Sequence, residues 1–329
     1  DIIMARGKTK LSKSSREKIA LFWNLRDDRV FSIPDVDSIY TIPALLKQQK
    51  FDTLLFWKLG IPFYESAKLT AWNQIFLNSQ EKVVRVWLIG KYTALEDSYS
   101  SVVEALKHTG HMLWVSIEIS FINTRKKDGI AAVKKCDACI VPWGFGDTAV
   151  ENMIETLRYI RENNIPCLGI CLGLQLMTID YMRNVLGITH ANSLEFDKNC
   201  SPNDVITLLD SQKWIINLWG TMRLGKQASL LKVWKVESLY DQCKRISGAD
   251  VIYERFRHRF EVHPSFAKKL LKSDLNISGV SQKEWIVQFI EMDNSVHPYY
   301  VATQSHPELT SKLEDPAPLF VGLIQECLK

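Results

Sequence analysis

The chain has 329 residues, of which 46% are hydrophobic and 24% charged, and its formal net charge is +4. This near balance of charge gives no basis for a nucleic-acid-binding stripe, and no apolar run approaches the ~20 residues of a membrane span. The seven cysteines are an odd number at irregular spacing without a secretory leader, a pattern typical of reduced cytoplasmic thiols. We therefore expect a cytoplasmic protein with one large domain and part of another.

The first 58 residues alternate strand-like and helical segments, which predicts a parallel α/β sheet. The motif Gly7-Lys8-Thr9 resembles the end of a phosphate-binding loop, but that loop needs a glycine where Ile2 stands, so we reject it. The expected elements are an apolar start at 1–6, a helix at 15–25, a strand at 30–33 and a helix at 37–49.

Residues 59–82 form the expected linker between two domains. The periodicity weakens there and Pro62 interrupts it, while a short helix is expected near 69–77. Its Trp72 is expected to pack the linker onto a domain.

Residues 83–329 are expected to form the second domain, a doubly wound and mostly parallel α/β sheet. Its strands and helices alternate, and such folds bind ligands at the carboxyl ends of their strands. The expected strands are 83–89, 115–121, 138–141, 165–170, 285–292 and 299–304, and the expected helices are 98–108, 129–135, 150–162, 264–273 and 316–328. Residues 200–262 are expected to be irregular and rich in strands.

The stretch 165–175 is an apolar run that ends in Gly169-Ile170-Cys171-Leu172-Gly173 and leads into a helical pattern. This Gly-x-Cys-x-Gly spacing is the cysteine form of a nucleophile elbow. A sulfur there lies at a helix N-terminus, where the helix dipole favours a thiolate and the N–H of Leu172 can stabilise an oxyanion. A buried structural cysteine is the alternative interpretation.

A base for this thiol is predicted far downstream. The strand at 299–304 leads to His306 and Glu308, which lie two residues apart and point the same way on extended backbone. A cysteine nucleophile needs such a base and a group that orients it. Together with Cys171 they predict a Cys-His-Glu triad.

Cys136 and Cys139 form a Cys-x-x-Cys motif that can bind metal or undergo redox chemistry. A structural zinc site needs a second ligand pair, and the sequence offers none at a suitable spacing. We therefore expect no metal site.

Taken in order, the motifs resemble those of CTP synthases, specifically the class I glutamine amidotransferase domain and the end of the synthase domain. The resemblance covers nearly the whole chain. It is carried by residues 90–93, 97–99, 141–146, 169–175, 183–187, 191–196, 220–225, 257–262 and 305–308.

The resemblance implies the glutamine site. A zwitterionic amino acid needs a carboxylate for its ammonium group and a guanidinium for its carboxylate, and Glu195 and Arg259 match those positions. The loop at 142–146 is expected to face Cys171, with the Trp143 backbone as the second oxyanion donor beside Leu172. The remaining implied contacts with L-glutamine are Gly144, Phe145, Leu172, Gly173, Leu174 and Gln175.

The sequence departs from the family at Trp143, where the family has glycine. A positive φ at this tryptophan would be strained and would place glutamine hydrolysis in doubt. Asp147-Thr148-Ala149 also lack the arginine and glycine usual after this loop, which weakens the expectation of a normal GTP response. Trp219 and Phe256 are further departures that suggest a reshaped site.

The resemblance also implies nucleotide partners. Lys18 matches a position that contacts the pyrimidine nucleotide, Asp35 and Val36 match the border of the ATP adenine, and Arg223 matches a residue of the GTP response. In the intact enzyme, UTP, ATP with Mg²⁺ and glutamine give CTP, GTP is the activator, and the subunits form a homo-oligomer, a tetramer. The family's phosphate-binding loop has no counterpart in this chain, so we expect these nucleotide sites to be incomplete.

These observations predict glutamine hydrolysis by Cys171, His306 and Glu308, which needs no cofactor of its own, as the ammonia supply of a CTP synthase. Two alternatives stay open: an inactive pseudo-amidotransferase that serves as a binding or assembly module because of Trp143, and a stand-alone γ-glutamyl hydrolase.

Overall fold

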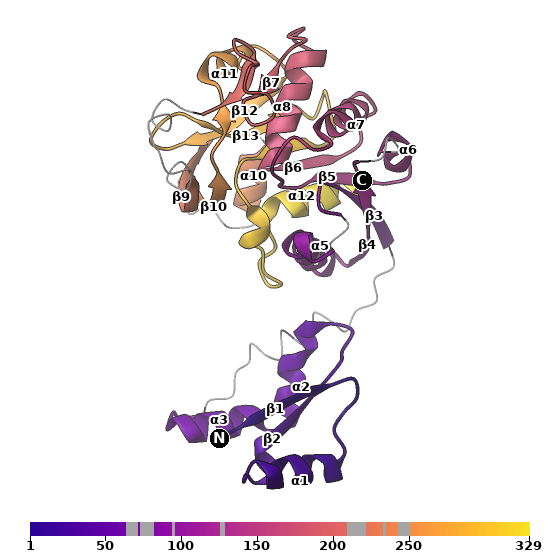
Figure 1. Ribbon diagram of the computed structural model, residues 1–329, viewed down its shortest axis with the longest axis vertical. Helices are drawn as coiled ribbons and strands as arrows, with labels where there is room; N and C mark the ends of the chain where they lie inside the picture. The colour runs from indigo at the N-terminus through magenta and orange to yellow at the C-terminus, as the bar shows by residue number, and fades with distance from the viewer. Residues whose placement is uncertain are drawn as a thin grey trace. The chain divides into compact units, whose positions relative to one another are not determined.

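The computed structural model describes residues 1–63, 72, 82–93, 96–125, 129–208, 222–232, 235–242 and 251–329. These residues fall into two compact units, 1–78 and 79–329 (Figure 1). The helix expected at 69–77 lies outside the described residues except for Trp72, and Trp219 lies outside them too.

The first unit contains a two-stranded parallel sheet, as the alternation of elements predicts. Its strands are β1 (Ile3–Gly7) and β2 (Val30–Pro34), and its α-helices are α1 (Lys13–Phe22), α2 (Ile42–Gln48) and α3 (Phe51–Leu59). The hydroxyl of Ser12 accepts from the Ser15 N–H at 3.1 Å and so caps α1. The indole of Trp72 donates to the Tyr40 carbonyl at 2.6 Å, which ties Trp72 to this unit.

The second unit is built on a nine-stranded mixed sheet with the order β10-β9-β12-β13-β14-β6-β5-β3-β4. The run β14-β6-β5-β3-β4 is parallel, and the run from β14 to β10 is antiparallel. The strands are β3 (Lys82–Gly90), β4 (Val115–Asn123), β5 (Ala138–Val141), β6 (Cys167–Ile170), β9 (Arg223–Leu231), β10 (Val251–His258), β12 (Leu275–Ser281), β13 (Val287–Met292) and β14 (Tyr300–Thr303). A second sheet, β11-β8-β7, uses Glu261–Val262, Asp204–Thr207 and Asn192–Ser193.

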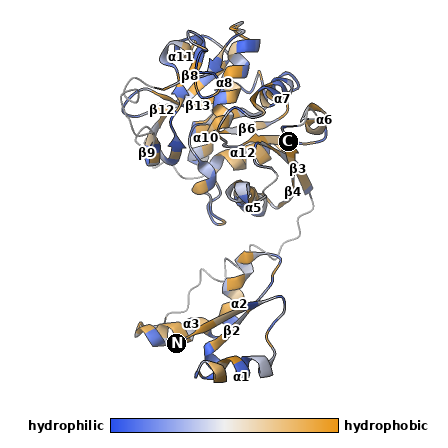
Figure 2. Ribbon diagram, in the orientation of Figure 1, coloured by the Kyte–Doolittle hydropathy of each residue, from blue (hydrophilic) through white to orange (hydrophobic). Residues whose placement is uncertain are grey.

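Helices cover both faces of the large sheet (Figure 1). One core lies under α7 (Val150–Glu162), α8 (Leu172–Asn184) and α11 (Pro264–Leu270), and the other under α5 (Ser100–Leu113), α10 (Lys235–Gln242) and α12 (Pro318–Cys327). Both cores use side chains of β5 and β6 because central parallel strands are buried on both faces. The apolar character of α12 is visible in Figure 2.

Most predicted elements around the site are confirmed. The strand 138–141 and the helix 150–162 have the predicted ends, whereas the helix expected at 98–108 begins at Ser100 and ends at Leu113. Helix α6 (Gly129–Val133) is two residues shorter than expected. The antiparallel half of the sheet includes β9 and β10, which belong to the region predicted only as strand-rich.

Candidate active site

Cys171 lies where β6 turns into α8, at the carboxyl end of a central strand. Its φ of 56° and ψ of −98° are unusual for a residue other than glycine. Its N–H donates to the Thr303 carbonyl on β14 at 2.7 Å, which holds the turn against the neighbouring strand. The backbone therefore has the sharp turn expected of a nucleophile elbow.

The two glycines of the elbow are required by close packing. A Cβ on Gly169 would lie 2.8 Å from the Ala302 Cβ, and a Cβ on Gly173 would overlap the Val141 carbonyl oxygen. Since both neighbours belong to the central sheet, no rotamer change can make room. The glycines thus let α8 approach β5 and β14 closely enough to place Cys171 at the sheet edge.

His306 and Glu308 are joined by a direct hydrogen bond. His306 Nδ1 and Glu308 Oε1 are 2.8 Å apart, and the two residues are 5% and 4% exposed. The backbone N–H of His306 also donates to the Arg255 carbonyl of β10 at 2.7 Å. Glu308 therefore orients the imidazole ring and leaves Nε2 as the nitrogen that can serve the thiol.

Cys171 and Glu308 both act on the titration of His306. Burial lowers the pKa of His306, but the interactions with Cys171 and Glu308 outweigh it and raise this pKa to about 10. The buried Nε2 makes no well-formed hydrogen bond within the described part of the chain. The histidine is thus poised beside the sulfur with its outer nitrogen still available.

Two further groups contact the sulfur. Gln304 Nε2 donates to Cys171 Sγ at 3.5 Å, and the thiol faces the Arg257 carbonyl at 3.9 Å. Gln304 Oε1 in turn accepts from Gln175 Nε2 at 3.3 Å, and Gln175 also donates to the Phe260 carbonyl at 3.1 Å. The amide of Gln175, predicted to bind glutamine, therefore supports Gln304 and the loop after β10.

The loop after β5 runs beside the elbow. A Cβ on Gly144 would lie 3.0 Å from the Leu172 Cδ2, so this loop and the start of α8 are in contact. Phe145 is 45% exposed, and its N–H donates to the Tyr92 hydroxyl at 3.2 Å. The structure therefore brings together the two backbone segments predicted to form the oxyanion hole.

The strain considered for Trp143 does not occur, because this residue does not adopt a positive φ. Its ring lies 5.4 Å from Tyr99 and 5.8 Å from Tyr92, measured between ring centroids. The Trp143 carbonyl accepts from the Tyr99 hydroxyl at 3.3 Å. The indole thus packs among aromatic side chains, and the larger residue is accommodated without a left-handed backbone.

Glu195 and Lys91 border the same loop. Glu195 Oε1 accepts from the Gly146 N–H at 2.8 Å; burial raises the pKa of Glu195, while this bond and the charges of Lys91 and Arg259 oppose the rise. Lys91 donates to the Gly146 carbonyl, and burial lowers its pKa to about 8. Glu195 and Arg259 therefore lie within electrostatic reach of each other, as a site for a zwitterion requires.

Gln304 and Lys91 were not predicted as site residues. Gln304 precedes His306 by two positions and so shares its face of the extended segment, which was the available signal. Lys91 belongs to a stretch that carried the family resemblance, but a lysine after a strand gives no indication of its contacts. Nothing in a sequence pattern distinguishes such a lysine from a solvated one.

The residues predicted to contact nucleotides are more exposed to solvent than the triad residues, or are held by ion pairs. Lys18 is exposed on α1, and the exposed Asp35 pairs with Arg6 Nη2 at 2.9 Å beside Val36. Arg223 forms ion pairs with Glu261 and Glu284. No group of three or more metal-ligating side chains was found in the described ranges.

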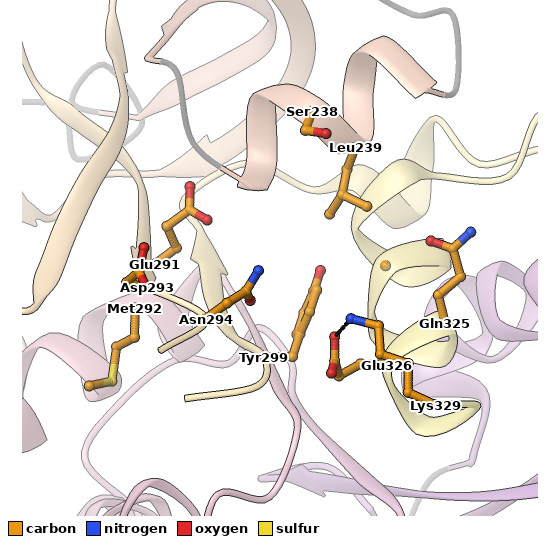
Figure 3. Close-up of a pocket in the computed structure, with 11 residues that line it drawn as sticks. Ser238, Leu239, Glu291, Met292, Asp293, Asn294, Tyr299, Gln325, Glu326 and Lys329 are labelled. Carbon is orange, nitrogen blue, oxygen red and sulfur yellow. Dashed lines mark hydrogen bonds and ion pairs between the residues drawn. The ribbon is translucent and has the colours of Figure 1, made fainter. Parts of the chain in front are cut away.

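A separate pocket of about 490 Å³ lies between α10, β13 and α12 (Figure 3). It is lined by Ser238, Glu291, Asp293, Tyr299, Gln325 and their neighbours, and an ion pair joins Glu326 to Lys329 across 2.8 Å. None of the predicted site residues lines it.

No helix among the described residues is long and apolar enough to cross a membrane.

The fold and the site belong to an identifiable class of proteins. The family model described as "Glutamine amidotransferase class-I" matches residues 94–326, so the chain belongs to the class I glutamine amidotransferases. The fold class predicted from the sequence is confirmed by this match.

More particular matches point to one branch of the class. The model described as "CTP synthase N-terminus" matches residues 1–61. A CTP synthase of Sulfurisphaera tokodaii is 39% identical in an alignment of 331 positions that covers 99% of this chain and 60% of that protein. The solved Trypanosoma brucei CTPS glutaminase domain with bound acivicin is 30% identical with a TM-score of 0.65, over 74% of this chain and 94% of that one. The resemblance to CTP synthases is thus confirmed, although the chain spans only 60% of the length of the first relative.

Proposed function

We propose that the second unit hydrolyses the side-chain amide of glutamine with Cys171, His306 and Glu308. The observation that carries the proposal is the elbow conformation of Cys171 next to a buried imidazole whose other nitrogen is held by Glu308 at 2.8 Å. A nucleophile, a base and a group that orients the base are the parts that thiol-dependent amide hydrolysis needs.

The chemistry follows from this arrangement. Nε2 of His306 takes the Cys171 proton, and the thiolate attacks the amide carbon of glutamine. The tetrahedral oxyanion accepts hydrogen bonds from the backbone N–H groups of Leu172 and the 143–144 loop. The imidazolium returns the proton to the leaving nitrogen, so ammonia departs and a glutamyl thioester remains. Water then attacks the thioester, which releases glutamate and restores the thiol.

Substrate recognition is assigned to the surrounding polar groups. Glu195 would hold the ammonium group of glutamine, and Arg259 its carboxylate. The remaining contacts would come from Gly144, Phe145 and the first turn of α8. Support comes from the burial of Glu195 and its electrostatic coupling to Arg259.

In the complete protein, the ammonia would pass to an amidoligase site that converts UTP to CTP with ATP and Mg²⁺, with GTP as activator and a homo-oligomer as the assembly. The match of residues 1–61 and the 39% identity to a CTP synthase support this role in pyrimidine nucleotide biosynthesis. A cytoplasmic location is consistent with it. For this chain itself we propose the glutaminase step.

Measurement of ammonia release from glutamine tests the proposal. The parent chain should release ammonia, and Cys171→Ala should release none. Cys200→Ala is the matched control, because Cys200 is a buried free cysteine in the loop before β8. A chloroketone analogue of glutamine should add one label, found at Cys171 by peptide mass. A silent parent that Trp143→Gly restores would instead indicate a blocked pocket, and a silent parent with an unlabelled Cys171 would refute the proposal.

A further inference from the structure

Four cysteines lie near one another at the end of the sheet opposite the elbow. Cys139 on β5 is the register partner of Cys167 on β6, and the Cys327 thiol donates to the Asp137 carbonyl at 3.4 Å. Cys136 precedes β5 in the loop after α6. Since Cys171 follows the carboxyl end of β6, these thiols take no part in the proposed hydrolysis.

Cys136 and Cys139 are in direct contact within this group. Their sulfurs are 3.3 Å apart, and both thiols are free. A disulfide has an S–S length of about 2.05 Å, so the sulfurs must approach by a little over 1 Å. The approach is feasible because Cys136 belongs to a loop and is only half-buried, whereas Cys139 is fixed in the buried strand.

A metal site is a poorer explanation of the same motif. The described residues contain no group of three or more ligand side chains arranged around a common point. Asp137, the acidic residue between the two thiols, is already held by Arg85, whose Nε and Nη2 donate to its carboxylate at 3.1 and 2.9 Å. The motif therefore offers two thiols and no further ligand.

We propose that Cys136 and Cys139 form a reversible disulfide, with a low-molecular-weight disulfide such as oxidised glutathione as the oxidant. The Cys136 thiolate attacks one sulfur of glutathione disulfide, which forms a mixed disulfide and expels one glutathione thiolate. The Cys139 thiolate then attacks Cys136 Sγ and expels the second. Two protein thiols are oxidised, one small disulfide is reduced to two thiols, and the two protons pass to the leaving thiolates.

The different exposure of the two thiols indicates the order in which they react. Cys136 is partly accessible and so meets the oxidant first, whereas Cys139 is 0% exposed and can react only with a neighbour. Burial and the adjacent thiols raise the pKa of Cys139 well above its ordinary value, so its attack depends on the closeness of Cys136.

Peptide mass after equilibration tests this assignment. Trypsin cuts after Lys135 and Arg158, so residues 136–158 form one peptide whose only cysteines are this pair. The whole chain is held in glutathione buffers from reducing to oxidising, quenched with acid, alkylated and digested. The expected peptide from oxidising buffer carries no alkyl group and is lighter by two hydrogens, and dithiothreitol restores two alkylation sites.

Two variants separate the steps. Cys139→Ser should leave Cys136 carrying one glutathione, and Cys136→Ser should leave Cys139 reduced because it is buried. Two alkylated cysteines in every buffer, a link from Cys136 to the Cys327 peptide, or binding of one zinc ion per chain would each overturn the proposal. If a variant fails to fold, the peptide-mass measurement on the parent chain is sufficient to test the proposal. Its outcome is independent of glutaminase activity, because the readout is the mass of a peptide that excludes Cys171.

Discussion

Gly173→Ala tests the close approach of α8 to β5. Within a helix, alanine is favoured over glycine by about 1 kcal/mol, so propensity alone predicts a more stable protein. The new Cβ, however, would overlap the Val141 carbonyl oxygen and lie 3.2 Å from the carbonyl carbon. Because this obstacle is backbone of a central strand, the helix itself must shift, and overpacking of this kind costs about 1–3 kcal/mol.

Because the overlap is with backbone, we expect a clash at the upper end of this range, about 3 kcal/mol. It exceeds the propensity gain by about 2 kcal/mol, which for a domain of this size lowers Tm by about 4–8 °C. The shift would also separate the Leu172 N–H from the 143–144 loop, so ammonia release should fall by more than the stability loss explains. Thermal unfolding and ammonia release below Tm are the assays. Gly7→Ala is the control, because Gly7 has no left-handed φ and an added Cβ there meets no atom closer than 3.8 Å. A Gly173→Ala variant with unchanged Tm and full activity would refute the reasoning.

Three further predictions concern charges of the second unit. Glu308→Gln removes one of the interactions that raise the pKa of His306, so an NMR titration should show this pKa below about 10. The rate at which the chloroketone analogue labels Cys171 should fall as well. Because the folded-state pKa of His306 lies above its ordinary 6.5, its contribution to stability is complete below about pH 6.5 and is lost as pH rises through about 10. Urea unfolding of the parent should show this loss, and His306→Gln should show less of it. In the parent, Arg161 Nε lies 2.7 Å from the fully buried carboxylate of Asp180. Asp180→Ala removes this partner and should lower the free energy of unfolding by about 3–5 kcal/mol in the same urea assay. A loss below about 1 kcal/mol would contradict the burial argument.

The parts of the site that lie next to each other along the chain were predictable. Glycine spacing around Cys171 predicts the elbow because only glycine permits such close packing on both sides of the turn. His306 and Glu308 were predictable as a pair because extended backbone places alternate residues on one face. The parallel half of the sheet followed from the regular alternation of strands and helices.

Features that depend on packing between distant segments were not predictable. Gln304 reaches Cys171 only because β14 pairs with β6, and no local pattern records that pairing. The sequence indicated that a glycine position had become Trp143, but only the coordinates show that its φ is not positive. Likewise, the antiparallel order of β9 and β10 depends on long-range register, which short irregular strands do not reveal.

Strand β10 contacts the backbone of His306 and faces the Cys171 thiol, although it is an edge strand of the nine-stranded sheet. Its Arg255 carbonyl receives the His306 N–H at 2.7 Å, and its Arg257 carbonyl faces the Cys171 thiol at 3.9 Å. Outer strands open more readily than central ones in native-state hydrogen exchange. An edge strand therefore holds the His306 backbone near the elbow, and the amide protons of β10 should exchange before those of the central strands β5 and β6.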